Sequence, residues 1–197
     1  MLKAIIFDVN GIFIESEKLS YRLQKDYGVS SQEVLSTLKE IMPKVRQLNA
    51  PSCATLFEPH LKKWKTGLTG KEFLDYWFSG EHLVSEMVKY GEKLRDEGLK
   101  VFLLSNNFKE RTDYYLLKFP ELFAMTDKAY FSHETGFTKP DKQAYLHILS
   151  EWNLNPQEVA YFDDSKENVQ AAEELGIHAE KWEGIAPAKK SIEKLLR

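Results

Sequence analysis

The stretch AIIFD at residues 4–8 decides the fold of this chain, because four apolar residues run directly into a carboxylate. The stretches VFLLS at 101–105 and VAYFDD at 159–164 repeat this pattern. Continuous apolar runs, in contrast to alternating ones, are typical of strands covered on both faces, as in a parallel sheet between two layers of helices. Weaker runs at 129–131 and 179–182 add two further candidate strands.

Helical patterns separate these strands in the second half of the chain. Apolar residues recur at helical spacing over residues 83–97, and Gly98 ends that pattern. Pro140 fits the first turn of a following helix, and Ser165 fits the N-cap of a helix over 166–175. The alternation of helix and strand predicts an α/β fold with a doubly wound, mostly parallel sheet.

Residues 15–80 break this alternation and read as helix without an apolar strand run. Ser30 and Glu33 have the spacing of a capping box. Residues that interrupt helices punctuate the segment: Pro43, Pro51, Pro59, Gly67 and Gly70. We therefore expect a discontinuous α/β core domain over 1–14 and 81–197, with a small helical domain over 15–80 inserted after the first strand.

Composition and charge exclude several classes of protein. The chain has 197 residues, of which 43% are hydrophobic, so it can build a core without disulfides or metals. Lys and Arg number 27 against 30 Asp and Glu, which leaves no basic excess for a nucleic-acid partner. Cys53 is the single cysteine, and neither a signal peptide nor an 18-residue apolar run is present. We expect a cytoplasmic protein without a membrane partner.

Polar residues gather where the predicted strands end. Asp8, Ser105 and the pair Asp163-Asp164 follow three strands, and the crevice beyond the carboxyl ends of such strands binds ligands in open α/β sheets. Lys139 lies on a loop that could reach the same edge. Carboxylates placed together repel unless a cation neutralises them. Hard oxygen ligands of this kind suit Mg²⁺, which often also binds substrate phosphate oxygens.

Four segments together carry a family resemblance. They are FDVNG at 7–11, LLSNN at 103–107, TKPD at 138–141 and YFDDSKENVQAAEELGI at 161–177. In this order and spacing they resemble the four motifs of the haloacid dehalogenase superfamily of hydrolases, and the helical insert resembles the cap domain of that family. The resemblance covers essentially the whole chain and implies a Rossmann-like core with a cap.

The resemblance also implies catalytic roles. Asp8 matches the nucleophile that becomes an aspartyl phosphate, and Ser105 matches the hydroxyl that holds the phosphoryl oxygens. Asn106 follows it, where its backbone or side chain can add a donor to the substrate. Lys139 matches the lysine that neutralises charge on the nucleophile and on the transferring phosphoryl group.

A magnesium site is implied by the same motifs. Asp163 and Asp164 match the acidic Mg²⁺ ligands, Asp8 completes the carboxylates, and the carbonyl oxygen of Asn10 is a further expected ligand. One Mg²⁺ and one lysine would supply the positive charge that phosphoryl transfer needs around the equatorial oxygens.

Asn10 departs from the family pattern, in which phosphatases carry a second Asp two residues after the nucleophile. An amide can form hydrogen bonds but cannot transfer a proton, and general acid–base catalysis is typically worth about 10²–10⁴-fold in rate. Three accounts stay open: a slow or specialised phosphatase, a regulatory protein with impaired turnover, or a substitution that traps an intermediate.

The leading functional prediction is a Mg²⁺-dependent phosphatase of a small phosphorylated metabolite. The alternative is a phosphate-binding or partner-binding protein on the same fold that turns over poorly, for which Asn10 is the main support. A haloacid dehalogenase is disfavoured, because removal of halide needs no Mg²⁺ and would not require Asp163 and Asp164. The substrate and the oligomeric state stay open.

Overall fold

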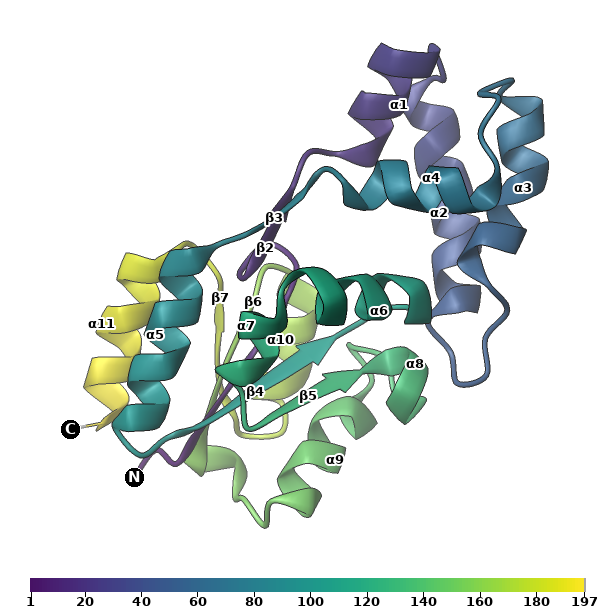
Figure 1. Ribbon diagram of the computed structural model, residues 1–197. Helices are drawn as coiled ribbons and strands as arrows, with labels where there is room; N and C mark the ends of the chain where they lie inside the picture. The colour runs from purple at the N-terminus through teal and green to yellow at the C-terminus, as the bar shows by residue number, and fades with distance from the viewer. Residues whose placement is uncertain (197) are drawn as a thin grey trace.

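The computed structural model describes residues 1–196 and has a parallel sheet of five strands at its centre, in the order β5-β4-β1-β6-β7 (Figure 1). The strands are β1 (Ala4–Phe7), β4 (Lys100–Ser105), β5 (Lys128–Phe131), β6 (Val159–Asp163) and β7 (His178–Lys181). Every neighbouring pair is parallel. The doubly wound α/β class expected from the apolar runs is confirmed, and all five candidate strands are present.

Helices cover both faces of the sheet because successive side chains of a strand point to opposite sides. Ile5 and Phe7 of β1 pack on one face in a cluster with residues of α5, α6, α7 and α11, whereas Ala4 and Ile6 pack on the other with residues of α9 and α10. These helices are α5 (Ser85–Asp96), α6 (Lys109–Lys118), α7 (Pro120–Ala124), α9 (Lys142–Glu151), α10 (Lys166–Glu173) and α11 (Ile185–Leu196). Burial of both faces explains why the strands read as unbroken apolar runs.

Two short helical segments complete this part of the chain: α8 (Ser132–Thr135) and the 3-10 turn η1 (Pro156–Glu158). No helix in the described part of the chain is long and apolar enough to cross a membrane.

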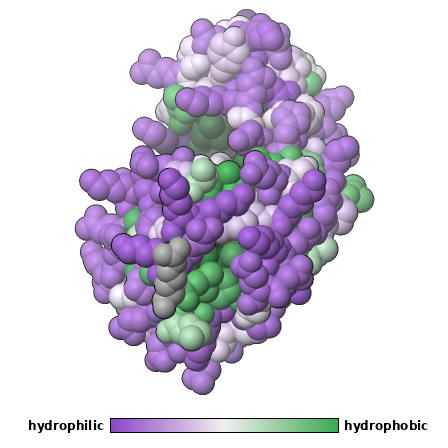
Figure 2. Space-filling model, turned by 90° about the vertical axis from the view of Figure 1, so that its left-hand side faces the viewer, coloured by the Kyte–Doolittle hydropathy of each residue, from purple (hydrophilic) through white to green (hydrophobic). Residues whose placement is uncertain are grey.

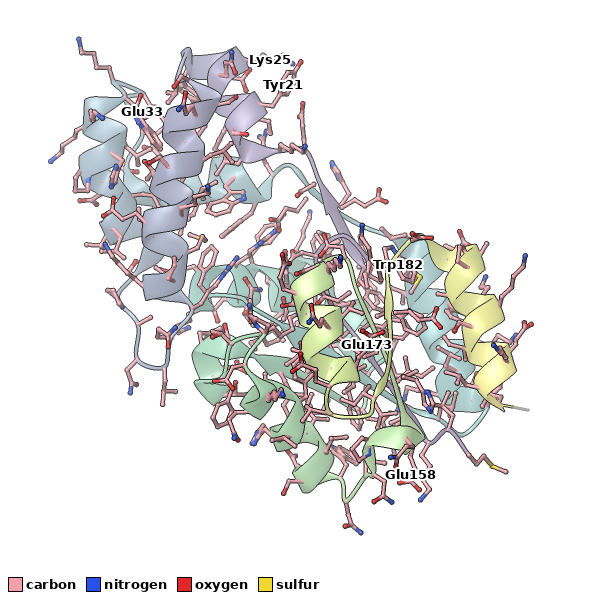
Figure 3. The ribbon with its side chains drawn as sticks, turned by 180° about the vertical axis from the view of Figure 1, so that it is seen from behind. Tyr21, Lys25, Glu33, Glu158, Glu173 and Trp182 are labelled. Atoms are coloured by element: carbon pink, nitrogen blue, oxygen red, sulfur yellow. The ribbon has the colours of Figure 1, made fainter. Side chains whose placement is uncertain are left out.

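Four helices, here called the helical layer, stand apart from the sheet at the top of Figure 1. They are α1 (Leu19–Tyr27), α2 (Ser31–Val45), α3 (Cys53–Lys63) and α4 (Gly70–Phe78). They share a hydrophobic cluster of their own, built around Phe57, Phe73 and Trp77. Figure 3 shows the same division from behind, with Tyr21, Lys25 and Glu33 on the helical layer and Glu158, Glu173 and Trp182 on the α/β part. The domain boundaries at 14/15 and 80/81 stay a prediction.

A small antiparallel ribbon connects the two parts and was missed by the sequence patterns. β2 (Ile14–Ser16) pairs with β3 (Glu81–Leu83), so the segment between the core strands is not helical throughout. The predicted helix over 83–97 accordingly begins at Ser85. Strands of three residues with polar members carry no apolar run and no alternation long enough to detect.

The expected interruptions at two prolines are wrong. Pro43 lies inside α2 and Pro59 inside α3, because the apolar faces of both helices are buried in the cluster of the helical layer and outweigh the lost backbone hydrogen bond. The Ser30–Glu33 box is half formed: Ser30 Oγ accepts the Glu33 N–H, but Glu33 pairs with Lys63 instead (2.6 Å).

The expected place of Pro140 is also wrong, because α9 begins after Asp141, whose side chain caps it by accepting the Gln143 N–H. Pro140 instead follows Lys139 through a cis peptide bond in the loop before the helix. Ser165 caps α10 as predicted.

Candidate active site

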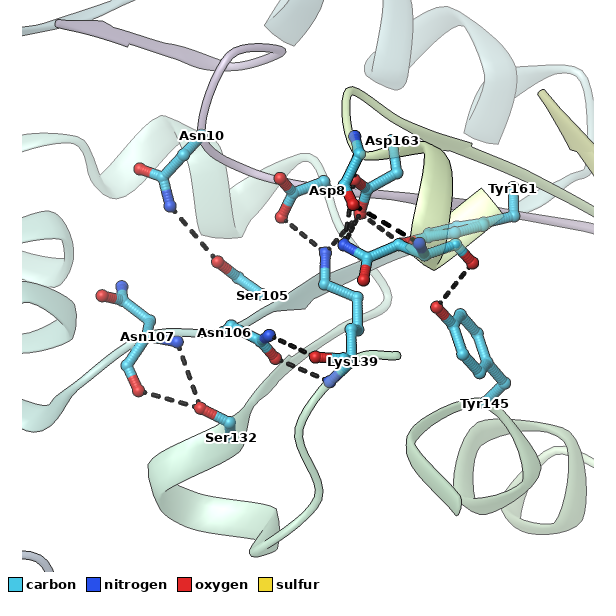
Figure 4. Close-up of polar contacts among 12 residues, drawn as sticks. Asp8, Asn10, Ser105, Asn106, Asn107, Ser132, Lys139, Tyr145, Tyr161 and Asp163 are labelled. Atoms are coloured by element: carbon cyan, nitrogen blue, oxygen red, sulfur yellow. Dashed lines mark hydrogen bonds and ion pairs between the residues drawn. The ribbon is translucent and has the colours of Figure 1, made fainter. Parts of the chain in front are cut away.

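The carboxyl ends of β1, β4 and β6 bring together the polar residues that follow them. Phe7 is in register with Leu103 on one side and with Phe162 on the other, so Asp8, Ser105 and Asp163 meet at one edge of the sheet (Figure 4). Asp8 is 8% exposed, Ser105 1% and Asp163 0%. Three polar residues are thus largely removed from water at the place where parallel sheets bind ligands.

Lys139 enters this site from the loop before α9. Its Nζ lies 2.8 Å from Asp8 Oδ1 and 2.6 Å from Asp163 Oδ2, and its side chain is 2% exposed. The main chain of Lys139 is fixed by Asn106, whose Oδ1 accepts the Lys139 N–H (2.8 Å) and whose Nδ2 donates to the Lys139 carbonyl (2.7 Å). A cation buried between two carboxylates is therefore held at both its backbone and its ammonium group.

Asp163 uses both carboxylate oxygens inside the protein. Besides Lys139, Oδ2 accepts hydrogen bonds from the Tyr161 hydroxyl and Asn168 Nδ2 (3.1 Å), and Oδ1 accepts from the Ser165 N–H (2.8 Å) and again from Asn168 (3.1 Å). Burial alone would raise the pKa of Asp163, but Lys139 and these donors outweigh burial and hold the pKa below its ordinary value. Asp163 is an ionised anchor for Lys139.

Asp8 and Asp164 have the opposite electrostatic character. Burial raises the pKa of Asp8, and Lys139 only partly offsets that effect. Burial and the neighbouring Asp163 raise the pKa of Asp164. One oxygen each from Asp8, Asp163 and Asp164 lies within 4.8 Å of the others. Carboxylates whose charge is disfavoured in this way would be relieved by a divalent cation.

The residues present fit Mg²⁺ by their chemistry. The cluster offers carboxylate oxygens alone, and the carbonyl oxygen of Asn10 accepts no hydrogen bond within residues 1–196. Gly11 allows the close approach of this loop, because its φ of +85° suits glycine and a Cβ there would lie 3.4 Å from Asp164 Oδ2. Hard oxygen donors of this kind suit Mg²⁺ rather than a softer metal.

Asn10 is held in one orientation by two side chains. The Tyr115 hydroxyl donates to Asn10 Oδ1 (2.8 Å), and Asn10 Nδ2 donates to Ser105 Oγ (3.4 Å). The donor end of the amide therefore faces Ser105, and its acceptor end faces α6. Tyr115 is 0% exposed, so water does not compete for this contact.

The sequence profile of the haloacid dehalogenase-like hydrolases matches residues 2–176. The chain belongs to this hydrolase family. The resemblance read from the four motifs is confirmed, and the family membership makes the strand-end cluster the candidate active site of a hydrolase.

Individual relatives extend this finding. A phosphorylated carbohydrates phosphatase of Thermotoga maritima is 25% identical over 186 residues, which cover 89% of this chain and 82% of that protein. A predicted haloacid dehalogenase-like hydrolase of Porphyromonas gingivalis is 27% identical, with a TM-score of 0.79 over 100% of this chain and 98% of its own. A family enzyme of Bacteroides thetaiotaomicron, solved with magnesium and inorganic phosphate, has a TM-score of 0.77 at 21% identity over 92% and 94% of the two chains.

The structure of this hydrolase brings together all of the residues singled out in the sequence. Asp8, Asn10, Ser105, Asn106, Lys139, Asp163 and Asp164 lie at one sheet edge or on its loops. Both ends of the Asn106 amide bond to the main chain of Lys139, which leaves one Nδ2 hydrogen unused, and substrate contact by that side chain stays a prediction. Direct metal contact by Asp163 likewise stays a prediction.

Sequence patterns gave no sign of Tyr115, which reaches Asn10 across a separation of 105 positions. Asn168, near the start of α10, makes a local contact by donating to Asp163. The helical layer of the hydrolase meets the core beside this site: Glu110 Oε1 accepts hydrogen bonds from Ser52 Oγ (2.7 Å) and the Cys53 N–H (2.8 Å).

Proposed function

We propose that this hydrolase cleaves phosphate monoesters of small metabolites with Asp8 as the nucleophile. The observation that carries the proposal is the buried contact of Asp8 with Lys139 beside Ser105 and Asp164, at the carboxyl edge of a parallel sheet. The phosphatase relative of matched length supports the same reaction class. A carboxylate poised beside a fixed ammonium group is suited to attack an anionic phosphorus centre, because the cation offsets the repulsion between them.

The first step transfers the phosphoryl group to Asp8. A carboxylate oxygen of Asp8 forms a bond to phosphorus while the bond from phosphorus to the ester oxygen breaks, and the leaving group departs as an alkoxide or aryloxide that takes its proton from water. Lys139 neutralises charge on the equatorial oxygens, and Ser105 Oγ donates a hydrogen bond to one of them. In the second step the oxygen of a water molecule bonds to the phosphorus of the aspartyl phosphate, the bond from phosphorus to the Asp8 oxygen breaks, and the water gives up a proton to the phosphate that is released or to solvent, which restores the Asp8 carboxylate.

Mg²⁺ is proposed as the cofactor, held by Asp8, Asp164 and the carbonyl oxygen of Asn10. When bound, it supplies positive charge that stabilises the phosphoryl oxygens. Asp163 keeps Lys139 in place in this arrangement, because its oxygens already accept internal hydrogen bonds.

Asn10 sets the expected substrate preference. Its Nδ2 can donate a hydrogen bond toward the leaving oxygen but has no proton to transfer at neutral pH. Aryl phosphates leave as stable anions without protonation, so they should react faster than alkyl phosphates. The helical layer, proposed as a cap over residues 15–80, would exclude water from the site and select the substrate.

The test is phosphate release from p-nitrophenyl phosphate and propyl phosphate, with Mg²⁺ and with a chelator. We expect metal-dependent release that Asp8→Asn abolishes, and a phosphoryl adduct on Asp8 in the intact mass of rapidly quenched enzyme. Asp113→Asn, which changes a half-exposed carboxylate of α6, serves as the matched control. Release that persists in Asp8→Asn contradicts the mechanism.

A second candidate, a phosphate-binding protein without turnover, is favoured by Asn10 alone. It predicts metal-dependent binding of inorganic phosphate by calorimetry with no release from either ester. The adduct on Asp8 distinguishes the two, because a binding protein forms none.

A further inference from the structure

Buried polar atoms without partners concentrate between the helical layer and the core. Among the described residues, the buried side-chain atoms with neither a hydrogen bond nor an ion pair are Arg46 Nε, Trp64 Nε1, Glu81 Oε2, Asn107 Nδ2 and Arg111 Nε. Except for Trp64, these residues lie where the helical layer meets the core. Since buried polar groups are normally satisfied, a group of exceptions at one place requires a cause.

Arg46 is the most conspicuous of these residues. It follows the last residue of α2, and its side chain has neither a hydrogen bond nor an ion pair within residues 1–196. Other arginines of the chain have hydrogen-bond partners: Arg22 donates to the Trp77 carbonyl (3.0 Å), and Arg95 donates to the Ala124 carbonyl (2.8 Å). Arg46 therefore carries a cation that the described part of the protein does not neutralise.

Arg46 lies at the end of the helical layer that meets the core. The preceding residue, Val45, is buried in the cluster of the helical layer that also contains Phe108, three residues after Ser105. Burial and the charge of Arg111 lower the pKa of Arg46, and Asp8 opposes this shift. The burial of Val45 beside Phe108 and this electrostatic influence of Asp8 together place Arg46 on the side of the site formed by the helical layer.

Arg111 lies near Arg46, and only part of its guanidinium group has a partner. Its Nη2 lies 2.5 Å from Glu81 Oε1, and its guanidinium group lies 5.8 Å from the ring of Trp77. Glu81 thus neutralises Arg111, and Arg46 adds a positive charge that has no ion-pair partner among the described residues. Figure 2 shows a recess between these parts, with apolar side chains at its floor.

The placement separates Arg46 from the groups that hold the reacting phosphoryl. Ser105 ends β4 and Lys139 precedes α9, so both belong to the core, whereas Arg46 follows α2 of the helical layer. We propose that Arg46, backed by Arg111, binds a second anionic group of the substrate, a carboxylate or a second phosphate, remote from the phosphoryl group that reacts. This inference rests on the proposed function for the position of the reacting end.

Binding of unreactive phosphonates tests the inference without requiring turnover. Propylphosphonate, 3-phosphonopropionate and propane-1,3-diphosphonate share one chain length and differ at the remote end, and their affinities with Mg²⁺ can be measured by calorimetry. We expect the wild type to bind at least one doubly anionic ligand about tenfold or more tighter than propylphosphonate. The better of the two shows whether carboxylate or phosphate chemistry is preferred.

Variants then assign the preference to Arg46. Arg46→Gln should remove at least about tenfold of the preference, and Arg46→Lys should restore part of it. Lys44→Gln, which removes an exposed charge from the last turn of the same helix, should leave the preference unchanged. Thermal unfolding of each variant checks that the fold is intact.

Three outcomes overturn the inference. They are no preference in the wild type, a preference that survives Arg46→Gln, and an equal loss of affinity for all three ligands, which would place Arg46 on the reacting phosphoryl. Hydrolysis of propyl phosphate, measured separately, distinguishes failure of the Arg46 proposal from failure of the proposed phosphatase activity. Turnover without the preference refutes only the role of Arg46, and the preference without turnover refutes only the phosphatase.

Discussion

Two groups of charges in the interior parts of this protein, one buried and one half-buried, are built in opposite ways. At the sheet edge, Lys139 is paired with Asp8 and Asp163, and Asp163 has hydrogen bonds on both oxygens. Between the helical layer and the core, Arg46 has no partner among the described residues, and the pair Arg111–Glu81 leaves Glu81 Oε2 and Arg111 Nε without a hydrogen bond. The first group is complete in the protein itself, and the second is incomplete.

The difference separates two uses of buried charge. A buried pair satisfied on all sides holds its members in fixed positions, which suits groups that must meet a transition state. A half-buried cation without a counterion is costly in the free protein, and an anion that binds beside it relieves that cost. The comparison therefore assigns positioning of the reaction to the sheet edge and recognition of the ligand to the helical layer.

The largest effect is expected from Lys139→Met. It leaves Asp8 and Asp163 buried together without their cation, and breaking one partner of a buried pair costs about 3–5 kcal/mol of unfolding free energy. Phosphate release should be lost as well, because the ammonium group no longer offsets the charge of the phosphoryl oxygens. Urea unfolding with a chelator present measures the stability term.

Two variants sharpen this prediction. Lys142→Met removes a half-exposed pair with Glu174 and should cost no more than about 1 kcal/mol. Arg46→Gln removes an unpaired charge and should leave unfolding unchanged or shift it upward. A large loss of stability in Arg46→Gln would show that this arginine is satisfied after all, and the contrast between the two groups would disappear.

Asn10→Asp is expected to give the next largest effect. A carboxyl group there can transfer a proton, and the contacts with Tyr115 and Ser105 can be kept because both hydroxyls can donate to it. Turnover of propyl phosphate should rise by about 10²–10⁴-fold, with a smaller gain for p-nitrophenyl phosphate, whose leaving group needs no proton.

Steady-state rates on both esters across pH measure this effect. An equal gain on the two esters would mean that the amide limits hydrolysis of the aspartyl phosphate rather than departure of the alcohol. No gain on either ester would exclude Asn10 as the cause of slow turnover.

The sheet and the residues at its edge could be predicted from the sequence for a common physical reason. Strands buried on both faces must be apolar throughout, so the first polar residue after each run marks the carboxyl edge, as Asp8, Ser105 and Asp163 do. Because the strands are parallel, their carboxyl ends lie at the same edge, so these residues can be placed together without knowledge of any individual contact.

The contacts of the site could not be predicted in this way. Tyr115 and Arg111 lie on α6 at helical spacing and read as ordinary helix residues, and Arg46 reads as a cation at the end of a helix. Their partners come from distant parts of the chain and depend on how the helical layer meets the core. β2 and β3 were not predicted for another reason: strands of three residues are too short to show an alternation of apolar and polar residues.

The smallest effect is expected from Tyr115→Phe, which tests whether Asn10 is held in a fixed position like the paired charges at the sheet edge. The change removes one hydrogen bond to Asn10, worth about 1 kcal/mol, so the rate on propyl phosphate should fall by roughly three- to tenfold. Tyr114→Phe is the matched control, because its half-buried hydroxyl makes no hydrogen bond within residues 1–196. A double-mutant cycle with Asn10→Ala isolates the contact: if Tyr115 acts through Asn10, its loss has no effect on the rate once Asn10 is gone. An equal fall in both backgrounds would make Tyr115 a packing residue of α6 and would leave Asn10 positioned by Ser105 alone.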